Sequence, residues 1–221
     1  MGLGRSVGFT NGVRRALGQD KEAADTFATR LTELLGYFTG DQQTHPGVHA
    51  LPSEGQPISP FILATGAGAD IAAAFGLPLV AGGPRATEAI TRYRTDFRPS
   101  RWSPHPYVIV AATIAVADTT EQARRLLLPE AWATAHSRTH GEFPALRSPE
   151  DVLAMDLTPR ERTLLAEASR GQLHGTPTEM ATALDDLITR TGADEVLVTL
   201  STHSREDMLT SYRHLATAAR N

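Results

Sequence analysis

Residues 61–81 read FILATGAGADIAAAFGLPLVA, and this stretch decides the fold class. Phe61–Ala64 and Leu77–Ala81 are short apolar runs without the polar alternation of a half-exposed strand. Such runs are typical of parallel strands that are covered on both faces. Between them lie a glycine-rich turn and an alanine-rich segment, 69–75, which ends at Gly76, a residue suited to terminate a helix. The stretch therefore predicts a strand, a helix and a second, parallel strand.

The same alternation of strands and helices continues along the chain. Further strands are predicted at Gly2–Gly4, Tyr107–Ala117 and Glu195–Ser201. Helices are predicted over residues 20–38 and 85–97, after Thr119 or Thr120, from the capping box at Thr176–Glu179 to about Thr191, and after Ser204. Residues 40–60 and 141–158, which are rich in proline, glycine and serine, are predicted to be long loops. This alternation indicates an α/β fold, and we expect one domain over residues 1–221.

The composition is that of an ordinary globular protein and excludes several functions. The chain has 221 residues, 41% of them hydrophobic, a net charge of −4 and no cysteine. Disulfides, thiolate metal sites and thiol catalysis are therefore excluded, and the charge does not favour nucleic acid or an anionic membrane as a partner. Neither a membrane-length apolar run nor a secretory signal pattern is present, so we expect a cytoplasmic protein.

Several segments match one known family in their order and spacing. They are Gly2–Arg5 (GLGR), Thr65–Pro78 with its AAAFGLP ending, Tyr93–Ser100 followed by Pro106–Val108, Ala117–Arg125, and finally Gly175–Pro177 with Gly192–Thr199. Together they resemble the bacterial-luciferase-like, flavin-dependent monooxygenases. No single segment is specific, but their order across nearly the whole chain makes the resemblance strong.

The resemblance implies a (β/α)8 TIM barrel that binds reduced FMN, or a deazaflavin in some branches, at the carboxyl ends of its strands. The chain resembles strands four to eight of that barrel, so the expectation is an N-terminally truncated partial barrel with parallel strands and flanking helices. An open barrel exposes strand edges and apolar sheet faces. We therefore expect a homodimer, a second chain that supplies the missing strands, or the protein's own long loops to cover them. Alternatively, Met1 stands inside what was a longer chain.

The resemblance also implies where the flavin phosphate binds. In the family, an arginine after strand four and the loop after strand five hold this phosphate. These positions correspond here to Arg5 and to Thr65, Gly66, Ala67 and Gly68. An arginine fork and the N–H groups of a glycine-rich turn that opens a helix both suit a phosphate. The alternative is that residues 65–68 form only a tight strand-to-helix turn.

No residue is assigned a catalytic role. Many relatives carry two histidines after strand six, where this chain has Ala81–Pro84 (AGGP). His136 and His140 have the spacing of metal ligands on a helix, but Ser137 stands where a zinc protease has its glutamate, so no metal is expected. Among the scattered histidines, His174 is of most interest, because barrel active sites collect at loop ends.

Two functions remain open. The first is an FMN-dependent monooxygenase that acts on paired donors with O2 and a small organic substrate, with the reduced flavin supplied by a separate reductase. FMN is favoured over a deazaflavin. The second is a degenerate, non-catalytic family member that binds flavin or serves as a partner subunit. The missing strands favour the second function and the family resemblance favours the first. The sequence does not name the substrate.

Overall fold

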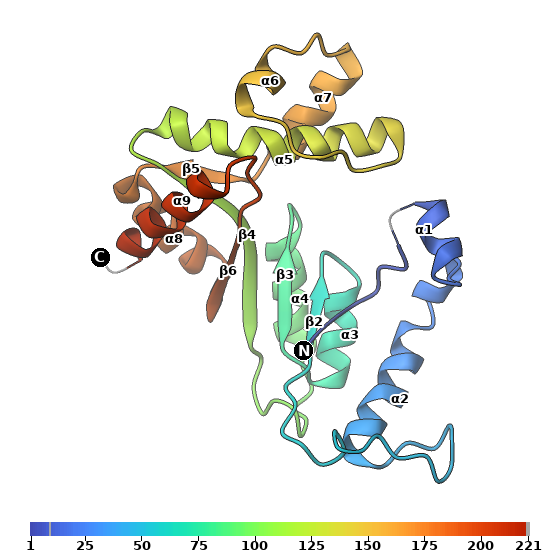
Figure 1. The fold of residues 1–221 in the computed structure, drawn as a ribbon. Helices are drawn as coiled ribbons and strands as arrows, with labels where there is room; N and C mark the ends of the chain where they lie inside the picture. The colour runs from blue at the N-terminus through green and yellow to red at the C-terminus, as the bar shows by residue number, and fades with distance from the viewer. Residues whose placement is uncertain (9, 220–221) are drawn as a thin grey trace. The chain divides into compact units, whose positions relative to one another are not determined.

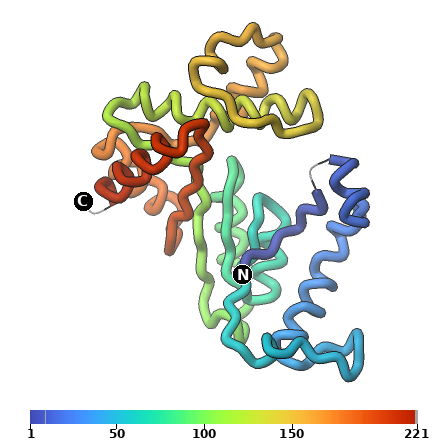
Figure 2. The backbone as a smooth tube through the Cα atoms, viewed as in Figure 1, coloured from blue at the N-terminus to red at the C-terminus, as the bar shows by residue number. Residues whose placement is uncertain are grey.

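The computed structural model describes residues 1–8 and 10–219, which form two compact units. The first unit comprises Met1–Ala81 and Glu88–Val108. The second comprises Gly82–Thr87 and the chain from Ile109 onward. Both units contain parallel strands with helices packed against them, as the ribbon and the backbone trace show (Figures 1 and 2). The expectation of a single domain stays a prediction.

Parallel strands form the centre of the first unit. They are β1 (Gly2–Gly4), β2 (Phe61–Ala64) and β3 (Leu79–Gly82), with β2 between the other two. Gly4 pairs with Leu63, and Leu63 pairs with Val80. The strand, helix and parallel strand predicted from residues 61–81 are confirmed, although β3 begins two residues later than expected.

The helix α3 (Gly68–Phe75) connects β2 to β3 and packs closely against β2 (Figure 1). Its residues Ala69, Ala72 and Ala73 are fully buried, and such small side chains let the helix approach the sheet. Gly76 ends the helix with φ +63°, and a Cβ there would lie 2.3 Å from the backbone oxygen of Arg98. Only glycine fits this position.

The remaining helices of the first unit are α1 (Asn11–Ala16), α2 (Phe27–Thr39) and α4 (Ala86–Asp96), of which Glu88 onward belongs to this unit. Tyr93 of α4 is fully buried, and its hydroxyl donates to the backbone oxygen of Leu77 at 3.0 Å. The same hydroxyl accepts from the backbone N–H of Tyr107 at 3.2 Å. Tyr93 thereby joins α4 to the segments that lead into β3 and β4.

The helix expected over residues 20–38 is interrupted. A 3-10 turn covers Glu22–Ala24, and α2 begins only at Phe27. The Asp20 carboxylate accepts from the N–H of Ala23, and the Thr26 hydroxyl donates to the oxygen of Ala23. These side chains compete with the helical hydrogen bonds and break the helix before α2. Residues 40–60 hold neither helix nor strand, as predicted.

The second unit is built on β4 (Val108–Val116), which continues into it from Ile109. Ile109–Thr113 pair with β6 (Glu195–Thr199), and Ile114–Val116 pair with β5 (Leu173–Gly175), all parallel. The sequence did not predict β5, which has only three residues. The core between these strands and the helices α8 (Pro177–Thr191) and α9 (Arg205–Ala218) is formed by buried residues that include Ile114, Val116, Met180 and Ala218.

The long connection between β4 and β5 is mostly helical. It contains α5 (Thr120–His140), α6 (Pro149–Leu153) and α7 (Pro159–Ala168). The prediction of a loop over 141–158 is therefore wrong at α6. Ser148 and Thr158 cap α6 and α7 by accepting backbone N–H bonds, and both helices begin with a proline. Among the described residues, no helix is both long enough and apolar enough to cross a membrane.

Candidate functional site

The two segments expected to bind the flavin phosphate leave the sheet of the first unit at the same edge. Arg5 follows β1, and residues 65–68 follow β2. Because β1 and β2 are parallel and Gly4 pairs with Leu63, the carboxyl ends of both strands lie side by side. Ligands of α/β proteins bind at this edge, where helix N-termini and loops converge. The fold thus brings together residues that are about 60 positions apart in the sequence.

Two hydrogen bonds to neighbouring residues fix part of the Arg5 guanidinium group. Its Nε donates to the backbone oxygen of Ala24 at 3.2 Å, and its Nη2 donates to the Asp25 carboxylate at 3.3 Å. About a third of the side chain (34%) is exposed, and the Asp25 side chain is 80% exposed. An arginine has five N–H donors, so N–H groups remain for an anion. Arg5 and Arg30 also line the same small cavity of about 200 Å³.

The turn at residues 65–68 presents its backbone to solvent. Thr65 and Ala67 are exposed, and no side chain caps α3, whose N-cap residue is Ala67. The oxygen of Gly66 accepts from the N–H of Ala69 at 2.9 Å, which closes the turn. An uncapped helix start with exposed backbone leaves N–H donors for a ligand or for water.

The two glycines of this turn differ in their structural role. A Cβ at Gly68 would lie 2.9 Å from the Cβ of Ala64, so close packing of α3 against β2 requires this glycine. A Cβ at Gly66 would meet nothing within 4 Å, and Gly66 does not have a positive φ. Neither packing nor backbone conformation explains Gly66, whereas access of a ligand to the backbone would.

One feature of the turn opposes an anion. Asp70 lies in the first turn of α3, where its negative charge occupies the favourable end of the helix dipole. Arg92 binds this carboxylate through Nε at 3.1 Å. The ion pair is exposed on both sides, with side-chain exposures of 47% for Arg92 and 51% for Asp70. The pair reduces the local negative charge.

The histidines singled out from the sequence lie in the second unit. The rings of His136 and His140 stack at a centroid distance of 3.9 Å, and Trp132 lies next to His136 at 5.4 Å. Within residues 1–8 and 10–219, no group of three or more potential ligands could hold a metal ion. His174 is exposed on β5.

Near His174, two helix starts share one carboxylate. Glu179 accepts from the Thr176 N–H at 2.7 Å and from the Thr120 hydroxyl at 2.7 Å. Hydrogen bonds from the Thr176 backbone, then from the two threonine hydroxyls, hold the pKa of Glu179 below its usual value. This arrangement ties the start of α5 to the start of α8, and its role is structural.

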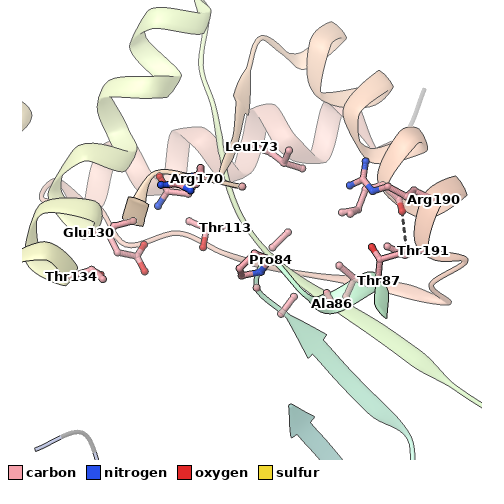
Figure 3. A pocket seen from close by; sticks show the side chains of 18 residues that line it. Pro84, Ala86, Thr87, Thr113, Glu130, Thr134, Arg170, Leu173, Arg190 and Thr191 are labelled. Carbon is pink, nitrogen blue, oxygen red and sulfur yellow. Dashed lines mark hydrogen bonds between the residues drawn. The ribbon is translucent and has the colours of Figure 1, made fainter. Parts of the chain in front are cut away.

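The second unit also contains a cavity of about 440 Å³ (Figure 3). Its walls come from residues 83–87 after β3, from β4, from α5, from residues 170–173 and from the end of α8. Its charged side chains are Glu130, Arg170 and Arg190. None of the three is predicted from the sequence, because they are 20 to 60 positions apart and match no motif.

The chain is similar to known proteins in both sequence and structure, although no protein-family model matches it. It is 29% identical to the uncharacterized protein YvbT of Bacillus subtilis (strain 168). This alignment covers 100% of this chain and 67% of YvbT. It is 28% identical to a luciferase-like monooxygenase of Escherichia coli (strain K12), over 90% of this chain and 60% of that protein. The chain thus spans about two thirds of the length of these relatives.

The structural likeness agrees with the sequence relatives. The apo-MsnO8 structure superposes with a TM-score of 0.82 at 26% identity, covering 100% of this chain and 67% of MsnO8. The monooxygenase RslO1 from Streptomyces bottropensis superposes with a TM-score of 0.62 at 18% identity, which shows the shared fold, and it covers 98% of this chain and 66% of RslO1. The fold class is therefore α/β, with parallel strands and flanking helices as in the TIM-barrel enzymes. Within that class, the chain is similar in both sequence and structure to the luciferase-like monooxygenases.

Proposed function

We propose that this protein is a flavin-dependent monooxygenase that uses reduced FMN and O2 to oxygenate a small organic substrate. The observation that carries the proposal is the placement of Arg5 and the open turn at residues 65–68 at one sheet edge of the first unit. Structures of the same fold include an FMN complex of the oxygenating constituent of 3,6-diketocamphane monooxygenase. A coenzyme F420 dependent tetrahydromethanopterin reductase also shares the fold.

In this proposal, Arg5 and the N–H groups of the turn hold the FMN phosphate. Reduced FMN, when bound, supplies the reaction with O2, and a separate reductase supplies the reduced flavin. The chain's own contribution is to bind and orient the cofactor at its phosphate end. The phosphate carries a charge that the guanidinium of Arg5 matches, and Gly66 lets it approach the backbone.

Binding of FMN and of riboflavin tests this assignment, because riboflavin lacks the phosphate. We expect Arg5→Ala to weaken FMN binding about ten- to hundredfold, the range expected for loss of a charge-assisted hydrogen bond. Its affinity for riboflavin should not change. Arg15→Ala, at an exposed arginine of α1, is the matched control and should bind both flavins as the wild type does. Absence of FMN binding at roughly tens of micromolar would contradict the proposal.

A second candidate function is favoured by the last residue of β3 and the two residues that follow it. Gly82, Gly83 and Pro84 carry no group that could donate or accept a side-chain proton. This composition favours a non-catalytic family member that binds flavin or acts as a partner subunit. Oxygen consumption in the presence of a flavin reductase distinguishes the two, provided FMN binding has first been established. Consumption above that of the reductase alone supports the monooxygenase.

We also propose that the protein associates with a second copy. Leu63 of β2 is 47% exposed in the first unit, and Leu197 of β6 is 48% exposed in the second. In each unit by itself, the exposed leucine leaves apolar strand surface that a second copy would cover. Sedimentation equilibrium should detect a dimer, and a monomer at micromolar concentration would contradict it. A cytoplasmic location stays a prediction.

A further inference from the structure

The cavity of the second unit contains a buried acceptor without a donor. Glu130 lies in α5, and its Oε2 is buried without a hydrogen-bond partner among the described residues. The carboxylate also makes no ion pair with those residues, so the protein itself does not satisfy it. Buried carboxylate oxygens are normally paired, because removing them from water is costly. Glu130 lines the cavity, so a donor in the cavity could reach it.

The same cavity also contains donors without an acceptor. Arg170 and Arg190 both line it, both are exposed, and neither side chain makes a hydrogen bond or ion pair with another described residue. Figure 3 shows Glu130, Thr134 and Arg170 on one side of the cavity, and Arg190 and Thr191 on the other. Two solvated arginines would be unremarkable on an open surface. Here they share one cavity with an unsatisfied carboxylate oxygen, and this combination indicates a ligand.

The remaining wall is largely apolar. Val110, Leu173 and Leu187 contribute aliphatic side chains, and Pro84 adds a ring near the end of β3. A volume of about 440 Å³ lies within the range of small-molecule sites. A matching ligand must carry an anionic group for an arginine, a hydrogen-bond donor for Glu130 and an apolar body for the aliphatic wall.

We infer that this cavity binds a small apolar zwitterion of the α-amino acid class. The carboxylate of the ligand pairs with Arg170, which lies on the same side of the cavity as Glu130, its ammonium group donates to Glu130, and its side chain contacts the aliphatic wall. The inference rests on the second unit alone, and it requires neither flavin nor the site in the first unit.

L-phenylalanine and two analogues test the inference. 3-Phenylpropanoate keeps the ring and the carboxylate but lacks the ammonium group, and phenethylamine keeps the ring and the ammonium group but lacks the carboxylate. Isothermal titration of the flavin-free protein should show L-phenylalanine binding roughly ten- to hundredfold more tightly than either analogue, because each analogue loses one charge-assisted contact. Equal affinities for the three compounds, or no binding of L-phenylalanine at millimolar concentration, would overturn the inference.

Substitutions in the cavity test which residue binds the ammonium group of the ligand and which binds its carboxylate. Glu130→Gln should weaken L-phenylalanine and phenethylamine about tenfold and leave 3-phenylpropanoate unchanged. Arg170→Gln should show the opposite selectivity. Glu121→Gln, on the same helix but outside the cavity, and Arg162→Gln, an exposed arginine of α7, are the matched controls. If Glu130→Gln weakens all three compounds equally, Glu130 does not contact the ammonium group and the assignment is wrong. The comparison of the three compounds on the wild type decides the inference even if a variant does not fold.

Discussion

Replacing Gly66 and Gly68 by alanine, one at a time, distinguishes a glycine that the fold requires from one that only ligand binding requires. Gly68 is the first kind and Gly66 is the second. A methyl group at Gly66 has no neighbour within 4 Å, and the backbone there is not in the positive-φ region. A methyl group at Gly68 would lie 2.9 Å from the Cβ of Ala64, which is closer than real Cβ contacts. The two substitutions are chemically identical and lie two residues apart in the same turn, so each serves as the control for the other.

The expected changes in stability have opposite signs. Alanine restricts the unfolded chain more than glycine does, so Gly66→Ala should raise the free energy of unfolding by about 0.4–1 kcal/mol. Gly68→Ala gains the same effect but forces α3 away from β2. Overpacking of this kind costs about 1–3 kcal/mol. The net result at Gly68 should be a loss of about 1–2 kcal/mol.

Urea unfolding measures these changes, and titration with FMN measures the effect on binding. Gly66→Ala should weaken FMN binding about tenfold, because the methyl group stands where a phosphate oxygen must approach the backbone N–H groups. Riboflavin affinity should not change. If Gly66→Ala binds FMN as tightly as the wild type, the turn does not hold the phosphate. If Gly66→Ala is destabilised, the assignment of free space at this residue is wrong.

Two further predictions concern stability. Tyr93→Phe removes the buried hydroxyl that is hydrogen-bonded to Leu77 and Tyr107. It should lower the free energy of unfolding, measured in urea, by about 1–2 kcal/mol. An unchanged unfolding midpoint would contradict the structural role of that hydroxyl. Glu179 has a lowered pKa in the folded protein, so its contacts stabilise the fold above the ordinary carboxyl pKa and are lost as pH falls through the lowered value. The stability advantage of the wild type over Glu179→Gln should therefore shrink as the pH falls below the ordinary carboxyl pKa and through the lowered one, and an advantage that grows on acidification would refute the assignment.

Local signals in the sequence were sufficient for most elements. Thr176 opens α8 with a capping box, and Gly192 ends that helix in the left-handed conformation, as predicted. The same kind of signal, a hydroxyl residue followed by proline, also stands at Ser148 and Thr158, where α6 and α7 begin. These helices were therefore predictable from the sequence. The helix α6 was missed because residues 141–158 were predicted to be a loop.

Other features had no local signal. The strand β5 has only three residues around the polar His174, so its strand conformation depends on pairing with β4. The break before α2 arises from the side chains of Asp20 and Thr26, which bind backbone groups instead of continuing the helix. Short strands and competing side-chain bonds are decided by context, because their intrinsic preference is weak.

For the proposed phosphate site, the choice of residues follows from the sequence alone. Arg5 and residues 65–68 stand out through the family resemblance and through the chemistry of arginine and of glycine-rich turns. Their placement at one sheet edge, the hydrogen bonds of Arg5 to Ala24 and Asp25, and the difference between open Gly66 and packed Gly68 are visible only in the folded chain. The physical reason is that strand pairing and helix packing join residues far apart in the chain.

The charged cavity of the second unit shows the same division more sharply. Glu130, Arg170 and Arg190 come from three separate segments, and each by itself reads as an ordinary surface residue. A buried oxygen without a donor cannot be recognised from residue type or spacing, because burial is a property of the assembled fold. The sequence determined the class of the fold and the local elements that build it. The tertiary structure decided which charges share a cavity and which of them the protein leaves unpaired.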